Sequence, residues 1–405
     1  RCERSVKTAA LPSSRPSGFF APMHVIICGG GVIGACTAYY LARRGARVTV
    51  VERAGVANAA SGKSGGFLAL DWCQGSALDE MARHSFTLHG QLATSLKREL
   101  DLDWGYRQVE TLSVVASQRR DLSHLGQRPA PSWLGTGAGV HDRIGTTDTT
   151  AQLDPARFTQ AMMRAAEAAG ATLRIGTVEG IELSEDGDRA TAAIVDGEIL
   201  PADAILLALG PWSILACHWL PLPGVFGLKG HSILFQFSPA TGDPATEGSI
   251  HEAPVLFAEV ETEDGEIETP EVVPRPDGTT YVCGLSSQAL MPVDPAAVTS
   301  DAGAVERLKK LAATLAPELA DAPILASQAC HRPVTEDGLP VIGRVPGVEA
   351  AYIASGHGVW GMLNGPATGQ AMASLILDGQ STHVDLTPFD PARLPRFDPD
   401  RLETK

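Results

Sequence analysis

The amino-acid sequence predicts a two-domain protein, in which an α/β domain with a parallel sheet is joined to an α+β domain built on an antiparallel sheet. A glycine-rich turn, Gly29–Gly34, lies between a strand-like run and a helical run near the front of the chain. The chain has 405 residues, more than one ordinary domain holds. Residues 225–285 are rich in strand-like runs. These features are typical of a Rossmann-like domain accompanied by a second domain.

The front of the chain predicts a β-α-β unit. The run Val25–Cys28 is short and apolar, residues 32–44 have helical character, and Arg47–Val51 reads as the next strand. The uncharged stretch Val25–Ala42 is long enough to suggest a membrane span. We reject that interpretation because the glycines at 29, 30, 31 and 34 separate strand, turn and helix.

The rest of the chain continues this alternation. Helices are predicted over 76–100, 158–169 and 300–315, the second of them starting with Asp154 as N-cap and Pro155 in the first turn. Further strands are predicted near 109–116, 171–175, 177–184, 190–195 and 203–209.

The last third of the chain predicts three further features. The acidic segment Glu259–Glu271 should form a solvated loop or an edge hairpin. A last helix should begin at Asn364–Pro366 and end at Gly379. The proline-containing tail 381–405 should form an extended wrap.

Composition limits the functional classes. Apolar residues make up 44% of the chain, which fits a soluble globular protein with a sizeable core. The net charge of −15 argues against a sequence-independent nucleic-acid binder, because such proteins need a basic face. The seven cysteines contain no C-x-x-C pair, so we expect neither a metal site nor a disulfide framework, but reduced thiols of an intracellular protein.

The first 22 residues differ from the rest. Arg1, Arg4, Lys7 and Arg15 occur there with a single acid, Glu3. This composition fits the remains of a transit peptide for a chloroplast or mitochondrion. It fits equally well a disordered extension of a cytoplasmic protein ahead of Met23.

The glycine-rich turn predicts a dinucleotide site. Gly29 permits the tight turn, Gly31 lets the backbone approach a pyrophosphate, and Gly34 lets the helix pack closely on the strand. The helix N-terminus then offers free N–H groups to the phosphates. Glu52 ends the second strand, where an acid can accept hydrogen bonds from ribose hydroxyls and disfavours a 2′-phosphate. The following segment Asn58–Gly66 either brings backbone amides to a second part of a long cofactor or is a flexible linker.

Five blocks of the sequence resemble the D-amino-acid-oxidase family, which includes glycine oxidase and monomeric sarcosine oxidase. The blocks occur in the family's order, at Val25–Gly34, Ala60–Gly62, Ala208–Ser213, Arg332–Gly343 and Gly356–Gly369. The stretch Pro274–Gly284 is also similar to a eukaryotic branch of oxidoreductases whose substrate the motif does not reveal.

The resemblance implies an FAD-binding domain of the glutathione-reductase type, with the flavin at its boundary with the substrate domain. We expect the FAD-binding domain at 23–75, 150–225 and 330–380, and the substrate domain at 76–149 and 226–329. The cofactor-binding residues expected from the turn and the family blocks are Gly29, Gly31, Val32, Ile33, Gly34, Glu52, Arg53, Ala60, Ser61, Gly62, Ser64, Gly65, Gly66, Val178, Gly210, Trp212, Arg332, Gly356, Gly358, Val359, Trp360, Gly361 and Met362.

The family also implies oxidation of an amine, usually an amino acid, to an imine by hydride transfer to flavin N5, with oxygen as the acceptor and hydrogen peroxide as product. Alternatives are a dehydrogenase that passes electrons to a quinone or carrier, and an FAD-bound scaffold without catalysis. The substrate and the oligomeric state stay open.

Three side chains are candidates for the substrate side. Arg332 matches the family's carboxylate-binding arginine, and its alternative is an ion pair with Glu336 or Asp337. His357 either faces the flavin or is a hydrogen-bonded core histidine.

Glu271 replaces a substrate-facing tyrosine of glycine oxidase and could bind an amine or diamine; we favour its being the last acid of the solvated loop.

Three further features concern the flavin and its reoxidation. A helix beginning near Gly365 would point its positive end at N1–C2=O. Cys330 stands where sarcosine oxidase attaches its flavin covalently, but the Arg-Pro pair that follows favours non-covalent FAD. The stretch Thr280–Gly284 contains no lysine to match that enzyme's oxygen-activating lysine, which argues against fast oxidase behaviour.

Overall fold

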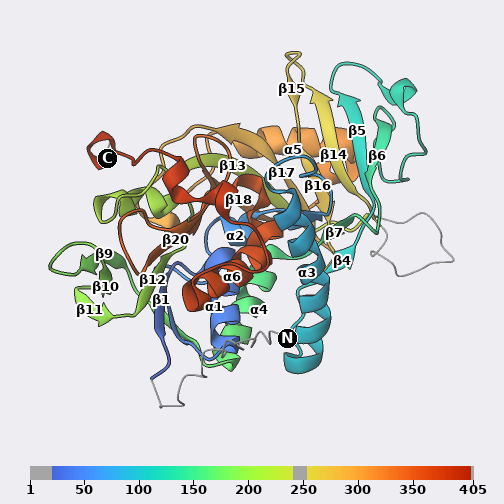
Figure 1. Cartoon of the computed structure of the whole chain (residues 1–405). Coiled ribbons are helices and arrows are strands. Elements are labelled where there is room, and N and C mark those ends of the chain that lie inside the picture. The colour runs from blue at the N-terminus through green and yellow to red at the C-terminus, as the bar shows by residue number, and fades with distance from the viewer. Residues whose placement is uncertain (1–20, 240–252, 403–405) are drawn as a thin grey trace, which may run out of the picture.

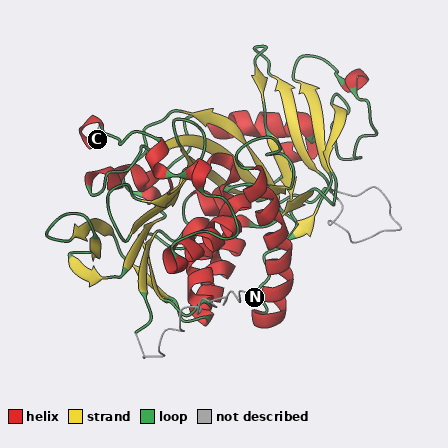
Figure 2. Ribbon diagram, in the orientation of Figure 1, coloured by secondary structure: helices red, strands yellow, loops and turns green. Residues whose placement is uncertain are grey.

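The computed structural model describes residues 21–239 and 253–402 (Figure 1). The predicted transit peptide therefore lies almost entirely outside the described residues. Figure 2 shows the long helices gathered at the centre of this view, with strands on either side of them.

The first sheet contains the predicted β-α-β unit. Its order is β19-β20-β12-β1-β2-β8, and all neighbours are parallel except β19 and β20. Four of the strands, β1, β12, β19 and β20, have at most one residue outside the buried class, as strands covered on both faces should. The bounds are β1 His24–Cys28, β2 Arg47–Glu52, β8 Thr172–Ile175, β12 Ala204–Leu207, β19 Val341–Arg344 and β20 Ala351–Ser355.

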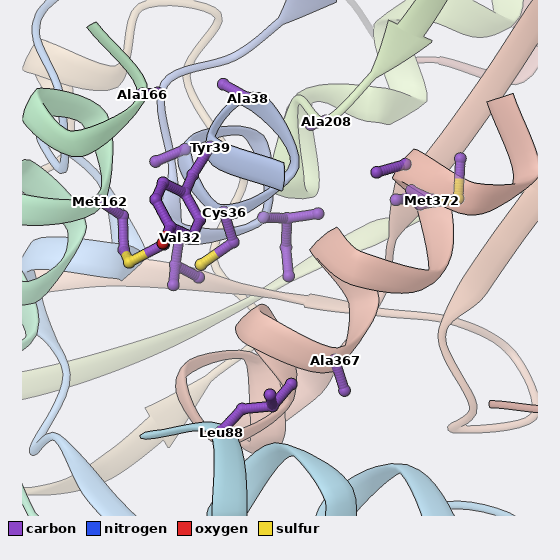
Figure 3. Close-up of a cluster of buried hydrophobic side chains, with 14 of the residues drawn as sticks. Val32, Cys36, Ala38, Tyr39, Leu88, Met162, Ala166, Ala208, Ala367 and Met372 are labelled. Atoms are coloured by element: carbon purple, nitrogen blue, oxygen red, sulfur yellow. The ribbon is translucent and has the colours of Figure 1, made fainter. Parts of the chain in front are cut away.

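Four helices share one hydrophobic core with this sheet. They are α1 Val32–Arg43, α3 Asp79–Leu100, α4 Pro155–Ala168 and α6 Gly361–Asp378. Helix α1 lies between α4 and α6, and α3 packs against α6. Leu88 of α3, Met162 of α4 and Met372 of α6 belong to the same cluster (Figure 3). This burial explains the uncharged run at 25–42. Among the described residues, no helix is both long and apolar enough to cross a membrane.

Helix α4 begins as predicted: the Asp154 carboxylate accepts a hydrogen bond from the Arg157 N–H at 2.8 Å, and Pro155 occupies the first turn.

Helix α6 begins at Gly361, and the prediction of a start at 364–366 was wrong. Pro366 lies inside the helix and has no N–H for the Met362 carbonyl. His89 of α3 supplies the missing donor, since its Nε2 lies 3.0 Å from that carbonyl oxygen. Ser85 Oγ accepts a hydrogen bond from the Ala367 N–H at 3.1 Å. Side chains of α3 thus satisfy the backbone groups that Pro366 leaves without partners inside α6. The helix ends at Gly379 in the left-handed region, as predicted.

The second large sheet has the order β18-β13-β17-β16-β14-β5-β6, with β15 attached to β14. All its pairs are antiparallel except β14 with β5. Helix α5 Ala304–Leu315 packs on it through Leu308, Leu311 and Leu315. The strands are β5 Thr111–Ser117, β6 Gly139–Gly145, β13 Phe226–Phe235, β14 Val255–Glu261, β15 Ile267–Glu268, β16 Glu271–Pro274, β17 Thr280–Ser287 and β18 Ile324–Val334.

Two small sheets complete the fold. One consists of β9 Val178–Leu183, β10 Ala190–Val195 and β11 Glu198–Pro201, and the other of β3 Phe67–Ala69, β4 Arg107–Gln108 and β7 Thr150–Gln152. Strand β11 was not predicted, although its signal is present. Asp196 and Gly197 both have positive φ, +50° and +76°, the conformation of a two-residue hairpin turn with the sequence Asp-Gly.

The remaining expectations on the fold have mixed outcomes. The acidic segment is an edge hairpin as far as β15, but Glu271 belongs to β16. The described part of the tail forms short 3-10 turns at Thr387–Phe389, Pro391–Arg393 and Pro399–Arg401. The six described cysteines are free thiols, and five of them are buried. The described residues contain no cluster of ligands suited to a metal ion.

Candidate functional site

A cavity of about 610 Å³ lies between the parallel sheet and one face of the antiparallel sheet. It is lined by Gly29, Gly31 and Glu52, at the carboxyl ends of β1 and β2. From the antiparallel sheet it is lined by Glu271 and Arg332, among others. The volume is in the range of cofactor and ligand sites, and the carboxyl ends of parallel strands are where α/β sheets bind dinucleotides.

The three glycines of the first turn have different roles. Gly29 has φ +114°, and a Cβ there would lie 2.3 Å from the Ala208 carbonyl oxygen. A Cβ on Gly34 would lie 2.0 Å from the Gly29 carbonyl oxygen. Gly31 has φ −76°, and among the described residues its Cβ would meet only the Ser61 side chain, with Oγ at 3.1 Å. Gly29 and Gly34 are therefore required by the fold, whereas Gly31 keeps the cavity wall open.

Glu52 holds the turn from the end of β2. Its Oε2 accepts a hydrogen bond from the Gly30 N–H at 2.7 Å, and its Oε1 accepts one from the Ala54 N–H at 2.9 Å. The carboxylate also lines the cavity, so it stands where ribose hydroxyls can donate to it.

The segment after Glu52 is not a flexible linker. It forms a helical turn, α2 Ala60–Lys63, which is joined to the antiparallel sheet by a 2.9 Å hydrogen bond from Tyr281 Oη to the Lys63 carbonyl. The Ser61 hydroxyl accepts the Val32 N–H at 2.9 Å and so caps α1. Ser64 Oγ is buried, lines the cavity and has no hydrogen-bond partner among the residues that the structure describes. A buried hydroxyl without a partner, next to the cavity wall that Gly31 keeps open, fits the binding of a polar cofactor.

The cavity brings together most of the predicted cofactor residues. Those that line it are Gly29, Gly31, Val32, Ile33, Glu52, Arg53, Ala60, Ser61, Ser64, Gly65, Gly66, Val178, Gly210, Trp212, Arg332, Gly358, Val359, Trp360, Gly361 and Met362.

Gly34, Gly62 and Gly356 do not line the cavity. Glycine is needed at these positions for close packing rather than for contact with the cofactor. A Cβ on Gly62 would lie 2.0 Å from the Ala57 carbonyl oxygen, and one on Gly356, at φ +82°, would lie 2.7 Å from Thr335 Cγ2.

His357 combines its two predicted roles. It lines the cavity, yet it is buried, with Nε2 3.0 Å from Thr368 Oγ1. Its Nδ1 has no hydrogen-bond partner in the described part of the chain. Burial lowers the pKa of His357 to about 3. The ring is therefore neutral at physiological pH, and its basicity is too low for it to accept a proton there.

Strand register explains the wall opposite the glycine turn. Glu271 of β16 pairs with Cys283 of β17, which pairs with Ser232 of β13. Gly230, two residues before Ser232, pairs with Cys330 of β18. Because alternate residues share a face, these side chains and Arg332, two residues after Cys330, point the same way, and all of them line the cavity.

Arg332 lies across a strand that carries no side chain at that point. A Cβ on Gly230 would lie 2.9 Å from Arg332 Nη2, so a side chain at this position would push the guanidinium away from its place over the strand. Arg332 Nη1 donates to Ser286 Oγ at 3.0 Å. The alternative ion pair is wrong: Asp337 pairs with Arg393 at 2.7 Å, and in the described part of the chain Arg332 pairs with neither Glu336 nor Asp337. Gly230 was missed from the sequence, because only the register reveals its position.

A β-bulge brings Ser286 to Arg332. Between His231↔Gly284 and Lys229↔Ser287, β17 has one residue more than β13. Leu285 in the bulge has φ +56°, and its carbonyl oxygen lies 2.6 Å from His231 Nδ1. The extra residue turns Ser286 toward the cavity face.

The position of Glu271 shows that the favoured prediction, an acid at the end of a solvated loop, was wrong. It is not part of the solvated loop, because it lies in β16 and its carboxylate lines the cavity. Cys283 Sγ donates to Glu271 Oε2 at 3.5 Å. Burial raises the pKa of Glu271, while the Arg332 guanidinium and the Cys283 hydrogen bond oppose that rise. The site thus contains a carboxylate and a guanidinium on one face.

Cys330 and Lys63 meet at the edge of this wall. Burial raises the pKa of the Cys330 thiol, and Arg332 and Lys63 counteract it. Lys63 Nζ donates to the Ala329 carbonyl at 3.3 Å and lines the cavity. The stretch 280–284 contains no lysine, but Lys63 brings an ammonium group to the cavity from another element. It could have been suspected from its place inside the small-residue loop.

A glycine turn, an acid at the end of β2 and a cavity at the carboxyl ends of the parallel strands are together typical of a dinucleotide-binding protein. Residues 24–375 match the DAO family of FAD dependent oxidoreductases, and the chain belongs to this family. Its cofactor is FAD, which the Gly31 cradle, Glu52 and the orphaned Ser64 hydroxyl fit.

Relatives match over nearly their whole length. A protein of Schizosaccharomyces pombe that bears the name "Putative oxidoreductase C1F5.03c" is 29% identical, with 91% of this chain and 97% of that protein covered. The glycine oxidase of Pseudomonas aeruginosa is 28% identical, with 91% and 98% covered. The structure of glycine oxidase from Geobacillus kaustophilus superposes with a TM-score of 0.72 at 24% identity, covering 92% and 99% of the two chains, which shows a shared fold.

We predict that FAD is held without a covalent bond. The partly buried Cys330 thiol has a raised pKa, which disfavours the thiolate that nucleophilic attachment needs. After acid precipitation of the purified protein, the yellow FAD should remain in the supernatant. If the flavin instead stays with the pellet and Cys330→Ser releases it, the cysteine is the attachment site.

Proposed function

We propose that the protein oxidises the CH–NH bond of an amino acid or N-substituted amino acid to an imine, with oxygen as the final acceptor. The observation that carries the proposal is Arg332: its guanidinium lies in the cavity over Gly230, and it has no ion-pair partner among residues 21–239 and 253–402. A planar guanidinium matches a carboxylate with two parallel hydrogen bonds. A substrate carboxylate is the natural partner for such a group.

The chain's own residues would bind and orient the substrate. Arg332 would hold the carboxylate, and Ser286 would keep the guanidinium from rotating. When bound, FAD supplies the acceptor for the two electrons and the hydrogen removed from the carbon. The neutral His357 ring and residues 358–362, which include Trp360 and Met362, would border the cofactor and exclude water from it.

We also propose a division of labour between the sheets. The parallel sheet with α1, α4 and α6 would carry FAD, and the antiparallel sheet would carry the substrate. Helix α3 belongs with the first part because it shares its core, and β18 runs through 324–334 without a break at residue 330. The dipole of α6 would act from Gly361 rather than from Gly365.

An electron acceptor other than oxygen defines the alternative, a dehydrogenase. One relative, a D-amino acid dehydrogenase of Methylobacterium radiotolerans, is 27% identical. The cavity-lining Lys63 ammonium favours the oxidase, because a cation stabilises the anionic form of reduced oxygen. A non-catalytic FAD scaffold is favoured by no feature of the cavity.

The test is anaerobic mixing of the purified yellow protein with glycine, N-methylglycine, D- and L-amino acids and polyamines, while the flavin absorbance is recorded. We expect a carboxylate-bearing amine to bleach the flavin. Readmitted air should restore the colour with release of hydrogen peroxide; slow recovery that a quinone accelerates would indicate the dehydrogenase. If no amine bleaches the flavin, the proposed activity is wrong and the scaffold is favoured.

A further inference from the structure

Glu271 is a carboxylate for which the protein provides little compensation. Its described hydrogen-bond partner is a thiol, Cys283 Sγ at 3.5 Å, and thiols are weak donors. No cation of the described chain lies within ion-pair distance of it; Arg332 acts on it only from farther away. A mostly desolvated carboxylate is costly unless a cation or a proton neutralises it.

The substrate would remove even the distant compensation. Once a substrate carboxylate pairs with Arg332, the guanidinium charge is neutralised and no longer offsets that of Glu271. The site then requires either a cation next to Glu271 or a proton on it. A free amino acid brings both, because at neutral pH its nitrogen is an ammonium group.

The ammonium nitrogen is also an obstacle to the reaction. A carbon next to a positively charged nitrogen does not give up hydride, since the nitrogen lone pair that stabilises the developing cation is occupied by the proton. The substrate must therefore lose one proton in the site, in which His357 is already fixed as a neutral hydrogen-bonded ring.

We propose that Glu271 accepts this proton, so that the protein takes up its amino acid as the zwitterion and converts it to the neutral amine after binding. This inference rests on the proposed function. One N–H bond of the ammonium breaks and one O–H bond forms on the Glu271 carboxylate. The nitrogen keeps the electron pair, nothing is oxidised in this step, and the proton returns to solvent after the product leaves.

The groups around Glu271 suit an acceptor that holds its proton during the reaction. Burial raises the pKa of Glu271, of Tyr281 and of the Cys283 thiol, so the last two stay neutral. Arg332, on β18, opposes the rise in the pKa of Glu271. Lys63, on α2, opposes the rise in the pKa of Cys330. Because the ionised form of Glu271 is the active one, activity is present above its raised pKa and is lost as pH falls through it.

The first experiment compares the pH dependence of wild type and Glu271→Gln. Anaerobic flavin reduction is measured from pH 6 to 10 with glycine, or with the amino acid of the panel above that bleaches the flavin fastest. Glutamine keeps the shape of the side chain but cannot accept the proton. Glu271→Gln should therefore use only the neutral amine, about one part in 10³ at pH 7 for an alkylammonium with pKa about 10.

Its kcat/KM should fall by about 10²–10³-fold at pH 7 relative to wild type, rise about tenfold per pH unit, and recover near pH 10. Glu271→Asp should restore part of the neutral-pH activity. The matched control is Glu259→Gln, which changes an exposed acid on β14 of the same sheet and should behave as wild type.

The second experiment counts protons without turnover. The probe is 2-aminoisobutyrate, an amino acid with no hydrogen on its α-carbon, so it binds but cannot be oxidised. Calorimetric titration in two buffers of different ionisation enthalpy gives the number of protons released. Wild type should release none at pH 7.5, because Glu271 keeps the proton, whereas Glu271→Gln should release about one per molecule bound, since it must bind the neutral amine.

Parallel pH profiles and equal proton counts for wild type and Glu271→Gln would overturn the inference. So would a loss confined to substrates with a second amine, because Glu271 would then bind a remote cation. Failure of the proposed function has a different signature, namely that the wild-type flavin is not reduced by any member of the panel.

Discussion

Arg332→Lys should lower kcat/KM for a carboxylate-bearing substrate by about tenfold to a hundredfold, with Arg332→Ala at least as damaging. A charge-assisted, two-pronged pair in a partly desolvated site is worth about 1.5–3 kcal/mol, and about 1.4 kcal/mol corresponds to tenfold in rate. Lysine keeps the charge but loses the planar fork, and with it the simultaneous contacts with substrate and Ser286. Anaerobic flavin reduction at several substrate concentrations measures the effect.

Two comparisons separate recognition from structure. The variant should lose much less on the matching amine without a carboxylate, and its FAD content should hardly change. Arg393→Lys is the control, because Arg393 pairs with Asp337 away from the cavity, and it should leave kcat/KM near wild type. Equal losses on both substrates would mean that Arg332 supports the fold. A wild-type preference for the bare amine would count against the amino-acid substrate.

The first part of the site could be predicted because its signals are local. Gly29, Gly31 and Gly34 sit between one strand and one helix, so a few consecutive residues determine both the turn and its purpose. Asp154 and Pro155 likewise specify the start of α4 through contacts within one turn. Such features need no information on distant segments.

The substrate side could be predicted only in part, because its residues meet through strand pairing. Glu271 follows a run of acids and was therefore assigned to the loop, yet its pairing with Cys283 turns it into the cavity. Gly230 carries no chemistry of its own, and its importance appears only when Arg332 is seen to lie across it. Neither relation is written in consecutive residues.

The start of α6 shows a different limit. Asn364-Gly365-Pro366 has the composition of a helix start, and proline is normally excluded from the interior of a helix. Here His89 and Ser85 satisfy the groups that the proline leaves without partners, so the helix continues through it. The contact from His89 of α3 to Met362, 273 residues apart in the chain, overrides the local preference.

Gly31→Val should yield a folded protein that no longer retains FAD. At φ −76° and ψ −178°, Gly31 has an extended backbone that valine adopts without strain. Its Cβ would press on Ser61 Oγ at 3.1 Å, and its methyl groups would enter the cavity where the N-terminus of α1 faces the cofactor phosphates. Forcing extra methyl groups into a packed contact costs about 1–3 kcal/mol, so FAD affinity should fall by about tenfold to a hundredfold or more.

The decisive comparison is with Gly29→Val, since both changes add the same atoms to the same turn. Gly29 has φ +114°, and its Cβ would lie 2.3 Å from the Ala208 backbone, so this variant should lose the fold itself. Gly31→Val should instead melt cooperatively, close to wild type from which FAD has been removed, while its flavin absorbance after gel filtration is largely lost. Full FAD occupancy in Gly31→Val would show that the pyrophosphate does not approach this glycine, because a branched side chain and a phosphate cannot occupy the same space.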